Sequence, residues 1–129
     1  MEAPPFGMTL LISGVILAAA FSVYYVVALA AEGKLGHNGS AGIRLSPLLR
    51  SEEAWQAGHT AALTVAKRQC VVVAILAALT VLVSPYPWLY IAGLSACLAV
   101  ILISTVLCVV RAVRAANSVG SAAGLSLEP

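Results

Sequence analysis

The chain has 129 residues, of which 61% are hydrophobic and only 9% are charged, and its net charge is +2. A soluble domain carries roughly a quarter charged residues, so this chain has too few to cover a surface that faces water. Lipid must be the solvent for most of it, and the small net charge does not indicate a nucleic-acid partner. We therefore expect one all-α membrane domain over residues 1–129, with three transmembrane helices.

The first predicted span is the apolar run 6–31. At ~1.5 Å per residue a helix of this length reaches about 39 Å, more than the ~30 Å hydrocarbon core, so it can cross with tilt. A cleaved signal peptide is the alternative interpretation. No Lys or Arg precedes the run, however, and apolar sequence continues beyond the alanines 18–20, so we expect the segment to be retained.

The second predicted span follows a polar connection, residues 32–68, which begins with a Gly-rich loop. Ser51 offers a helix N-cap, and two glutamates follow in the first turn, where the helix dipole favours carboxylates. No proline interrupts the chain from there to Pro85, so we expect one long helix over 52–83. Its first half is predicted to be amphipathic and cytoplasmic, and the second span itself is placed at 69–84.

The third predicted span, 88–110, follows a turn that is rich in proline and aromatic residues. Arg111 and Arg114 close this span. Residues 117–129 are small and include Gly and Ser, so a flexible tail is expected there.

The basic residues predict the orientation of the chain in the membrane. All seven Lys and Arg lie either in the connection 32–68 or just after the third span. With three spans these two places are on the same side, and the positive-inside rule makes that side cytoplasmic. We therefore expect an N-terminus outside the cell and a cytoplasmic C-terminus.

No catalytic motif is recognisable, and no set of residues has the spacing of a metal or cofactor site. The expectation is a protein that is not an enzyme and that has no catalytic residue, metal or cofactor. Cys70, Cys97 and Cys108 all lie in apolar runs, where packing is the expected role of a free cysteine.

Small residues recur at a spacing of four in the first span, at Gly14, Ala18 and Ser22. Such stripes let helix backbones approach closely in lipid. They serve either to pack the three spans on one another or to dock another membrane protein, and the sequence leaves both interpretations open.

A group of charged and aromatic residues surrounds the expected start of the long helix. Arg44 is expected to form an ion pair with Glu52 or Glu53, which would clamp the loop to the first turn. Trp55 and His59 share one helical stripe and should face the bundle or the lipid headgroups. A partner-binding role for this group is compatible with the clamp.

Residues 42–59 resemble the signature of the SdpI-like (SdpI/YhfL) bacterial integral membrane proteins. The residues that carry the resemblance are Gly42, Ile43, Arg44, Ser51, Glu52, Glu53, Ala54, Trp55, Gly58 and His59. In that family the same order of residues precedes a transmembrane helix. Leu45 stands where the family usually has Thr, and the name-giving members have further spans before the signature. The resemblance implies a bacterial plasma-membrane protein whose relatives give immunity to a secreted membrane-active peptide and bind a repressor.

Two functions fit this sequence. Small size, the small-residue stripes and the absence of catalytic groups favour an accessory or regulatory subunit of a larger bacterial plasma-membrane assembly, such as an envelope or lipid transporter. The resemblance implies instead an immunity or signalling protein that acts against a membrane-active peptide. The expected partners are membrane lipids and other integral membrane proteins, with a peptide toxin or a regulator under the second function, and no nucleic acid.

Overall fold

Three long helices make up the computed structural model, which describes residues 1–125. The elements are α1 (Phe6–Ala31), the short 3-10 helix η1 (Leu48–Arg50), α2 (Glu52–Leu82) and α3 (Pro87–Leu125). The all-α prediction is confirmed over this part of the chain, and each long helix is long and apolar enough to cross a membrane. The architecture is that of a multi-pass membrane protein.

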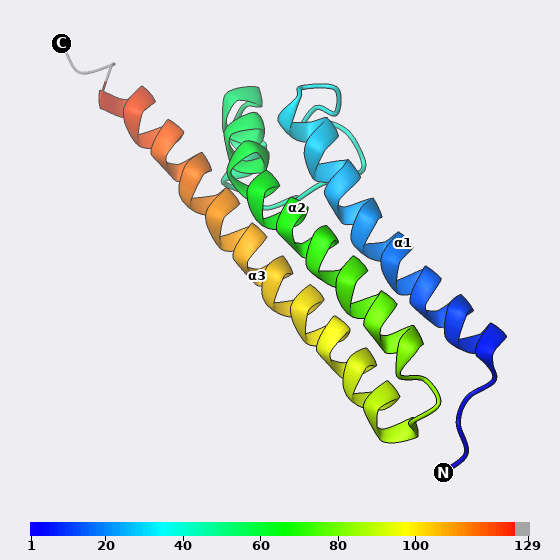
Figure 1. Cartoon of the computed structure of the whole chain (residues 1–129). Helices are drawn as coiled ribbons and strands as arrows, with labels where there is room; N and C mark the ends of the chain where they lie inside the picture. The colour runs from blue at the N-terminus through cyan, green and yellow to red at the C-terminus, as the bar shows by residue number, and fades with distance from the viewer. Residues whose placement is uncertain (126–129) are drawn as a thin grey trace.

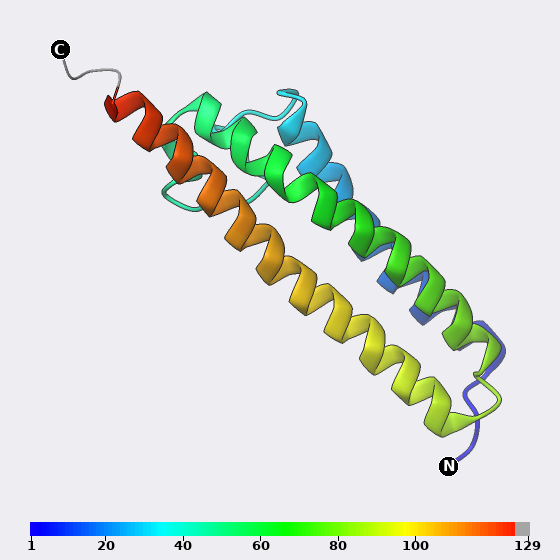
Figure 2. The ribbon, with the colours of Figure 1, turned by 60° about the vertical axis from the view of Figure 1, so that its left-hand side comes forward.

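The helices form an antiparallel row in which α2 lies between α1 and α3 and packs against both (Figure 1). We call the end where α1 finishes and α2 starts the loop end. The opposite end, where a short turn joins α2 to α3, is the turn end, and the N-terminus lies beside it (Figure 1). Figure 2 shows that α3 continues beyond the loop end.

α2 begins as the sequence predicts. The Oγ of Ser51 accepts a hydrogen bond from the backbone N–H of Ala54 at 3.1 Å, which satisfies one of the free donors of the first turn. The helix then runs without interruption to Leu82, which confirms the single long helix predicted for 52–83.

α3 differs from the prediction at its far end. It does not stop near residue 110 but is helical through 117–125, which is most of the segment expected to be a flexible tail. Ala112 and Ala116 are fully buried against the loop end, and Arg50 of η1 lies beside Gly120. Packing thus continues past the predicted end of the span; residues 126–129 lie outside the described part of the chain.

α1 packs through small residues, but in a register that differs from the predicted one. The buried residues of α1 are Thr9, Ser13, Ala20, Val27 and Ala30. Their spacings of three, four and seven are typical of helices that cross at a small angle.

The predicted packing stripe lies outside that seam. Gly14, Ala18 and Ser22 are all exposed, and a Cβ built on Gly14 would meet no neighbour within 4 Å. Of the two interpretations that the sequence leaves open, this exposure favours a docking surface over internal packing. The physical reason for the different register is that α1 is rich in Ala, Gly and Ser, so that small residues recur every four positions in more than one register.

Two glycines bring α3 close to α2. A Cβ on Gly58 would lie 3.1 Å from the carbonyl oxygen of Ala112 and 2.7 Å from Cδ2 of Leu48. A Cβ on Gly93 would overlap the side chain of Thr80. Close backbone approach of this kind supplies the dispersion contacts that hold helices together in lipid.

We expect Gly58→Ala to lower the free energy of unfolding by roughly 1–3 kcal/mol, because the new methyl group would press on the α3 backbone. Gly14→Ala is the matched control, since it brings the same gain in helix propensity at a position with open space. It should be neutral or slightly stabilising. Denaturant titration in detergent micelles, followed by circular dichroism, measures both. Equal effects of the two changes would contradict the close approach of α2 and α3.

Candidate functional site: the buried Trp55–His59 cluster

The residues that carry the sequence signature meet at the loop end, around two aromatic side chains of α2. Trp55 and His59 lie one turn apart, and both have an exposed fraction of 0%. Their ring centroids are 4.2 Å apart, with the ring planes tilted by 43°. Apolar residues of all three long helices and of η1 pack around them, among them Val27, Ala30, Leu48, Ala62, Ala66, Ala112 and Ala116. The predicted burial of Trp55 and His59 in the bundle is confirmed.

Trp55 ties the start of the loop to α2. Its indole Nε1–H donates to the carbonyl oxygen of Leu35 at 2.7 Å. Leu35 lies four residues past the end of α1. In between, Gly33 has a φ of +74°, and the N–H groups of residues 34 and 35 return to the carbonyl of Leu29. This is a helix C-terminus closed by a left-handed glycine. The indole bond therefore holds the end of α1 against the first turn of α2.

His59 ties a later part of the loop to the same place. Its Nδ1 lies 2.9 Å from the carbonyl oxygen of Trp55, and its Nε2 lies 3.0 Å from the backbone N of Ile43. A carbonyl oxygen can only accept and a backbone N–H can only donate, so Nδ1 carries the hydrogen and Nε2 is the acceptor. These two partners select the neutral imidazole in a single tautomer.

Gly42 is required where the loop crosses the rings. Its φ is +112°, a conformation that side chains rarely adopt. A Cβ at this position would lie 2.7 Å from Cη2 of Trp55 and 3.0 Å from Nε2 of His59. The backbone of Gly42 thus lies directly on the aromatic pair, which places the N–H of Ile43 against the imidazole.

The predicted ion pair of Arg44 was wrong. Glu52 pairs with His37: its Oε2 accepts from the Nδ1 of His37 at 2.6 Å and lies 3.4 Å from the backbone N of His37. Arg44 is exposed and donates to the carbonyl oxygen of Gly39, and Glu53 is exposed and in no ion pair among the residues that the structure describes. The loop contacts Glu52 through His37, seven residues earlier in the chain than the predicted contact at Arg44, whereas the backbone N–H of Ile43 is directed at His59.

Three contributors to this cluster were not found from the sequence. Leu35 acts through its backbone carbonyl, which no residue type reveals. His37 lies in a Gly-rich loop without periodicity. Leu48 is fully buried against Gly58, and its only signal was the apolar pair that follows Pro47.

The cluster holds the loop against the helices, and its imidazole is not available for chemistry. Both nitrogens of His59 are engaged, so neither is available for proton transfer or metal ligation. Over residues 1–125, no group of three or more His, Cys, Asp and Glu side chains could hold a metal ion. The hydrogen bonds of Trp55 and His59 hold the long loop, residues 32–51, in place at the loop end.

We expect Trp55→Phe to lower the free energy of unfolding by about 1–2 kcal/mol, because it keeps an aromatic ring but leaves the carbonyl of Leu35 without its partner. Trp88→Phe is the matched control, since Trp88 is 75% exposed at the turn end. It should change stability by less than about 0.5 kcal/mol. Chemical denaturation followed by circular dichroism compares the two variants. An equal loss of stability in both would contradict a stabilising role for the indole hydrogen bond to Leu35.

Gly42→Ala should cost roughly 2–4 kcal/mol, from backbone strain together with overlap with the indole ring. Gly36→Ala, in the same loop, is the control, because its Cβ would meet the carboxylate of Glu52 at an ordinary 3.5 Å. Limited proteolysis offers a second measurement. The Gly42 variant should be cut in the loop 32–51 faster than the wild type, whereas the Gly36 variant should not.

Comparison with known proteins adds no relative to this picture. No family model, no curated protein and no solved structure matches the chain.

Proposed function

We propose that the protein is a non-catalytic integral membrane protein that acts by protein–protein contact in the bilayer. Its role is that of an accessory or regulatory subunit of a larger bacterial plasma-membrane assembly, such as an envelope or lipid transporter. The observation that carries the proposal is the small-residue stripe of α1, Gly14, Ala18 and Ser22, all three of which are exposed.

The stripe has the properties of a helix-docking surface. Large apolar side chains are also exposed on α1, Leu11, Val15 and Phe21 among them, so the small residues belong to a surface that is apolar. The hydroxyl of Ser22 donates to the carbonyl of Ala18 at 2.8 Å, which leaves no unsatisfied polar group on the surface. A partner helix could approach the backbone here and lose little side-chain entropy, because the small residues have little to lose.

The position of α1 in the row supports the same conclusion. Among the helices, α1 packs mainly on α2, and only five of its residues are buried, so much of its surface is free of contacts within the described chain. A partner that binds the outer face of α1 need not disturb the α2–α3 interface or the Trp55–His59 cluster.

The test is purification from the native membrane in a mild detergent, with and without a bulky residue on the stripe. Ala18→Leu should release a stoichiometric membrane partner, because the larger side chain keeps a partner helix from approaching the backbone of α1 closely. Ala99→Leu on α3 is the matched control, since Ala99 is also exposed and apolar. It should leave the complex intact. Wild-type protein that is purified without a partner would overturn the proposal.

The proposed location is the bacterial plasma membrane, with the N-terminus outside and the loop end in the cytoplasm. All seven Lys and Arg lie at positions 34, 44, 50, 67, 68, 111 and 114, and none lies before α1 or in the turn between α2 and α3. This asymmetry is what the positive-inside rule uses.

Single cysteines at Ser40 and Tyr86, in a background where the three native cysteines are replaced by Ala, test the orientation. Both sites are exposed, one in the loop and one at the turn end. We expect an impermeant thiol reagent to label position 86 in intact cells, and position 40 only after the membrane is opened. The reverse pattern would mean that the orientation is inverted.

A second candidate function is immunity or signalling of the SdpI-like kind. The observation that favours it is that the signature residues surround one cluster and leave Arg44 and Glu53 exposed, where a peptide or a regulator could reach them. Deletion should then sensitise cells to a membrane-active peptide. Arg44→Ala should remove protection while changing stability by less than about 0.5 kcal/mol. Unchanged sensitivity on deletion would exclude this function.

A further inference from the structure

A buried glutamine lies between α2 and α3 without a partner. Gln69 has an exposed fraction of 2%, and neither its Oε1 nor its Nε2 has a hydrogen-bond partner within residues 1–125. Burying an amide in this way is unfavourable unless something satisfies it. The residues one turn to either side, Val65 and Val73, are apolar, so packing alone does not require a polar group here.

Gln69 lines a cavity of about 180 Å³ between the two helices. Arg68 of α2 and Arg111 of α3 line the same cavity, together with Ser104. Both arginines are exposed, and neither is in an ion pair with a residue of the described chain. The polar residues that line this space are therefore two arginines, a glutamine and a serine, whose side chains carry hydrogen-bond donors that suit a phosphate group.

The rest of the cavity wall is apolar. Val72 and Val100 line it on the side toward the turn end. A ligand that fits both parts has an anionic head and a hydrocarbon chain. The sequence predicts the membrane boundary near residues 67–69, and lipid phosphates are expected at the depth of that boundary.

We propose that this cavity binds an anionic phospholipid, with its phosphate held by Arg68, Arg111 and the amide of Gln69, and with an acyl chain along Val72 and Val100. The two helices that form the site do not include the α1 stripe, so the inference is independent of the proposed function. Inorganic phosphate has the same anionic group as the lipid head, but it has no hydrocarbon chain to contact the apolar wall.

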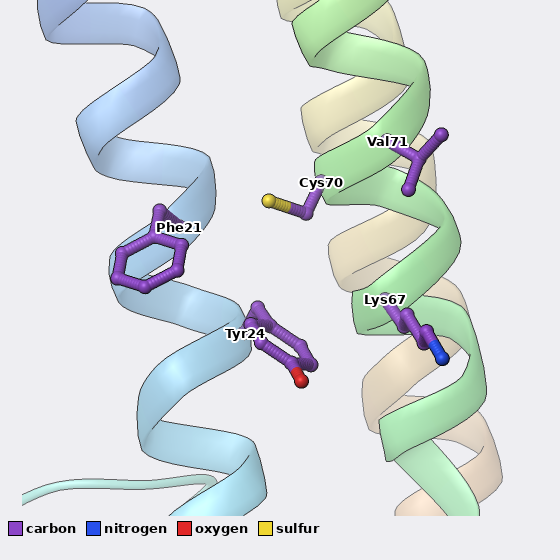
Figure 3. A pocket seen from close by; sticks show the side chains of 5 residues that line it. All are labelled: Phe21, Tyr24, Lys67, Cys70 and Val71. Atoms are coloured by element: carbon purple, nitrogen blue, oxygen red, sulfur yellow. The ribbon is translucent and has the colours of Figure 1, made fainter.

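A second cavity provides the internal control. It has a volume of about 200 Å³, lies between α1 and α2, and is lined by Phe21, Tyr24, Lys67, Cys70 and Val71 (Figure 3). It contains a single cation and no polar atom that is both buried and unpartnered. Lys67 is adjacent to Arg68 in the chain but lines the other cavity. Comparing the effects of replacing Lys67 and Arg68 on lipid binding therefore distinguishes a specific site from general attraction to a charged surface.

The experiment is native mass spectrometry of the purified full chain with an equimolar mixture of phosphatidylglycerol and phosphatidylcholine. Wild-type protein should retain one phosphatidylglycerol in preference. Gln69→Leu should reduce that retention about tenfold although no charge changes, because a hydrogen bond to a charged group is lost. Arg68→Gln with Arg111→Gln should reduce it about a hundredfold, and Lys67→Gln by no more than about fivefold.

Thermal unfolding shows whether the Gln69→Leu variant is still folded. Gln69→Leu should raise the melting temperature in lipid-free detergent, because it removes an unsatisfied buried amide, so that loss of lipid cannot be assigned to unfolding. If this variant does not fold, the arginine variants decide alone, since those side chains are exposed.

Three results would overturn the inference. The first is retention of phosphatidylglycerol unchanged by Gln69→Leu or by the double arginine variant. The second is equal loss with Lys67→Gln, which would indicate surface charge alone. The third is displacement of the lipid by millimolar inorganic phosphate, which would assign the cavity to a free anion.

Discussion

The neutral imidazole of His59 is the constraint on which the loop end depends. It accepts from the backbone of Ile43 and donates to the backbone of Trp55, so it joins a loop and a helix without involving an exposed charge. The adjoining indole extends the same connection to Leu35 at the end of α1. Buried polar networks are stable only when every member is satisfied, and in this one each ring nitrogen has its partner. The loop 32–51 owes its fixed course to these few bonds more than to regular structure of its own.

Much of this arrangement could be predicted, because it depends on residue types and their spacing. Apolar runs predicted three helices, and Ser51 with the following glutamates predicted where α2 begins. The helical spacing of Trp55 and His59 predicted that they would share one face, toward either the bundle or the headgroups, and the structure has both buried in the bundle. These features are local, so the sequence around each residue is sufficient to find them.

The features that could not be predicted depend on backbone conformation and on register. The pairing of His37 with Glu52, in place of Arg44, follows from where the positive φ angles of Gly33 and Gly42 turn the loop. The buried face of α1 follows from a one-residue difference between Ser13 and Gly14, in a helix where either register offers small side chains. The helical continuation of α3 past residue 110 depends on contacts with η1, which hydropathy does not report.

The row-like order of the helices has a consequence for how the protein assembles. α2 and α3 are joined by a short turn and can pair while both are newly inserted, since their contacts close only a small loop of chain. α1 adds to the free side of α2, and its junction with that hairpin at the loop end is completed by bonds that reach fifteen to twenty residues along the chain. The α2–α3 pair therefore closes a much shorter loop of chain than the α1–α2 pair, and the order of the three helices in space follows their order in the sequence.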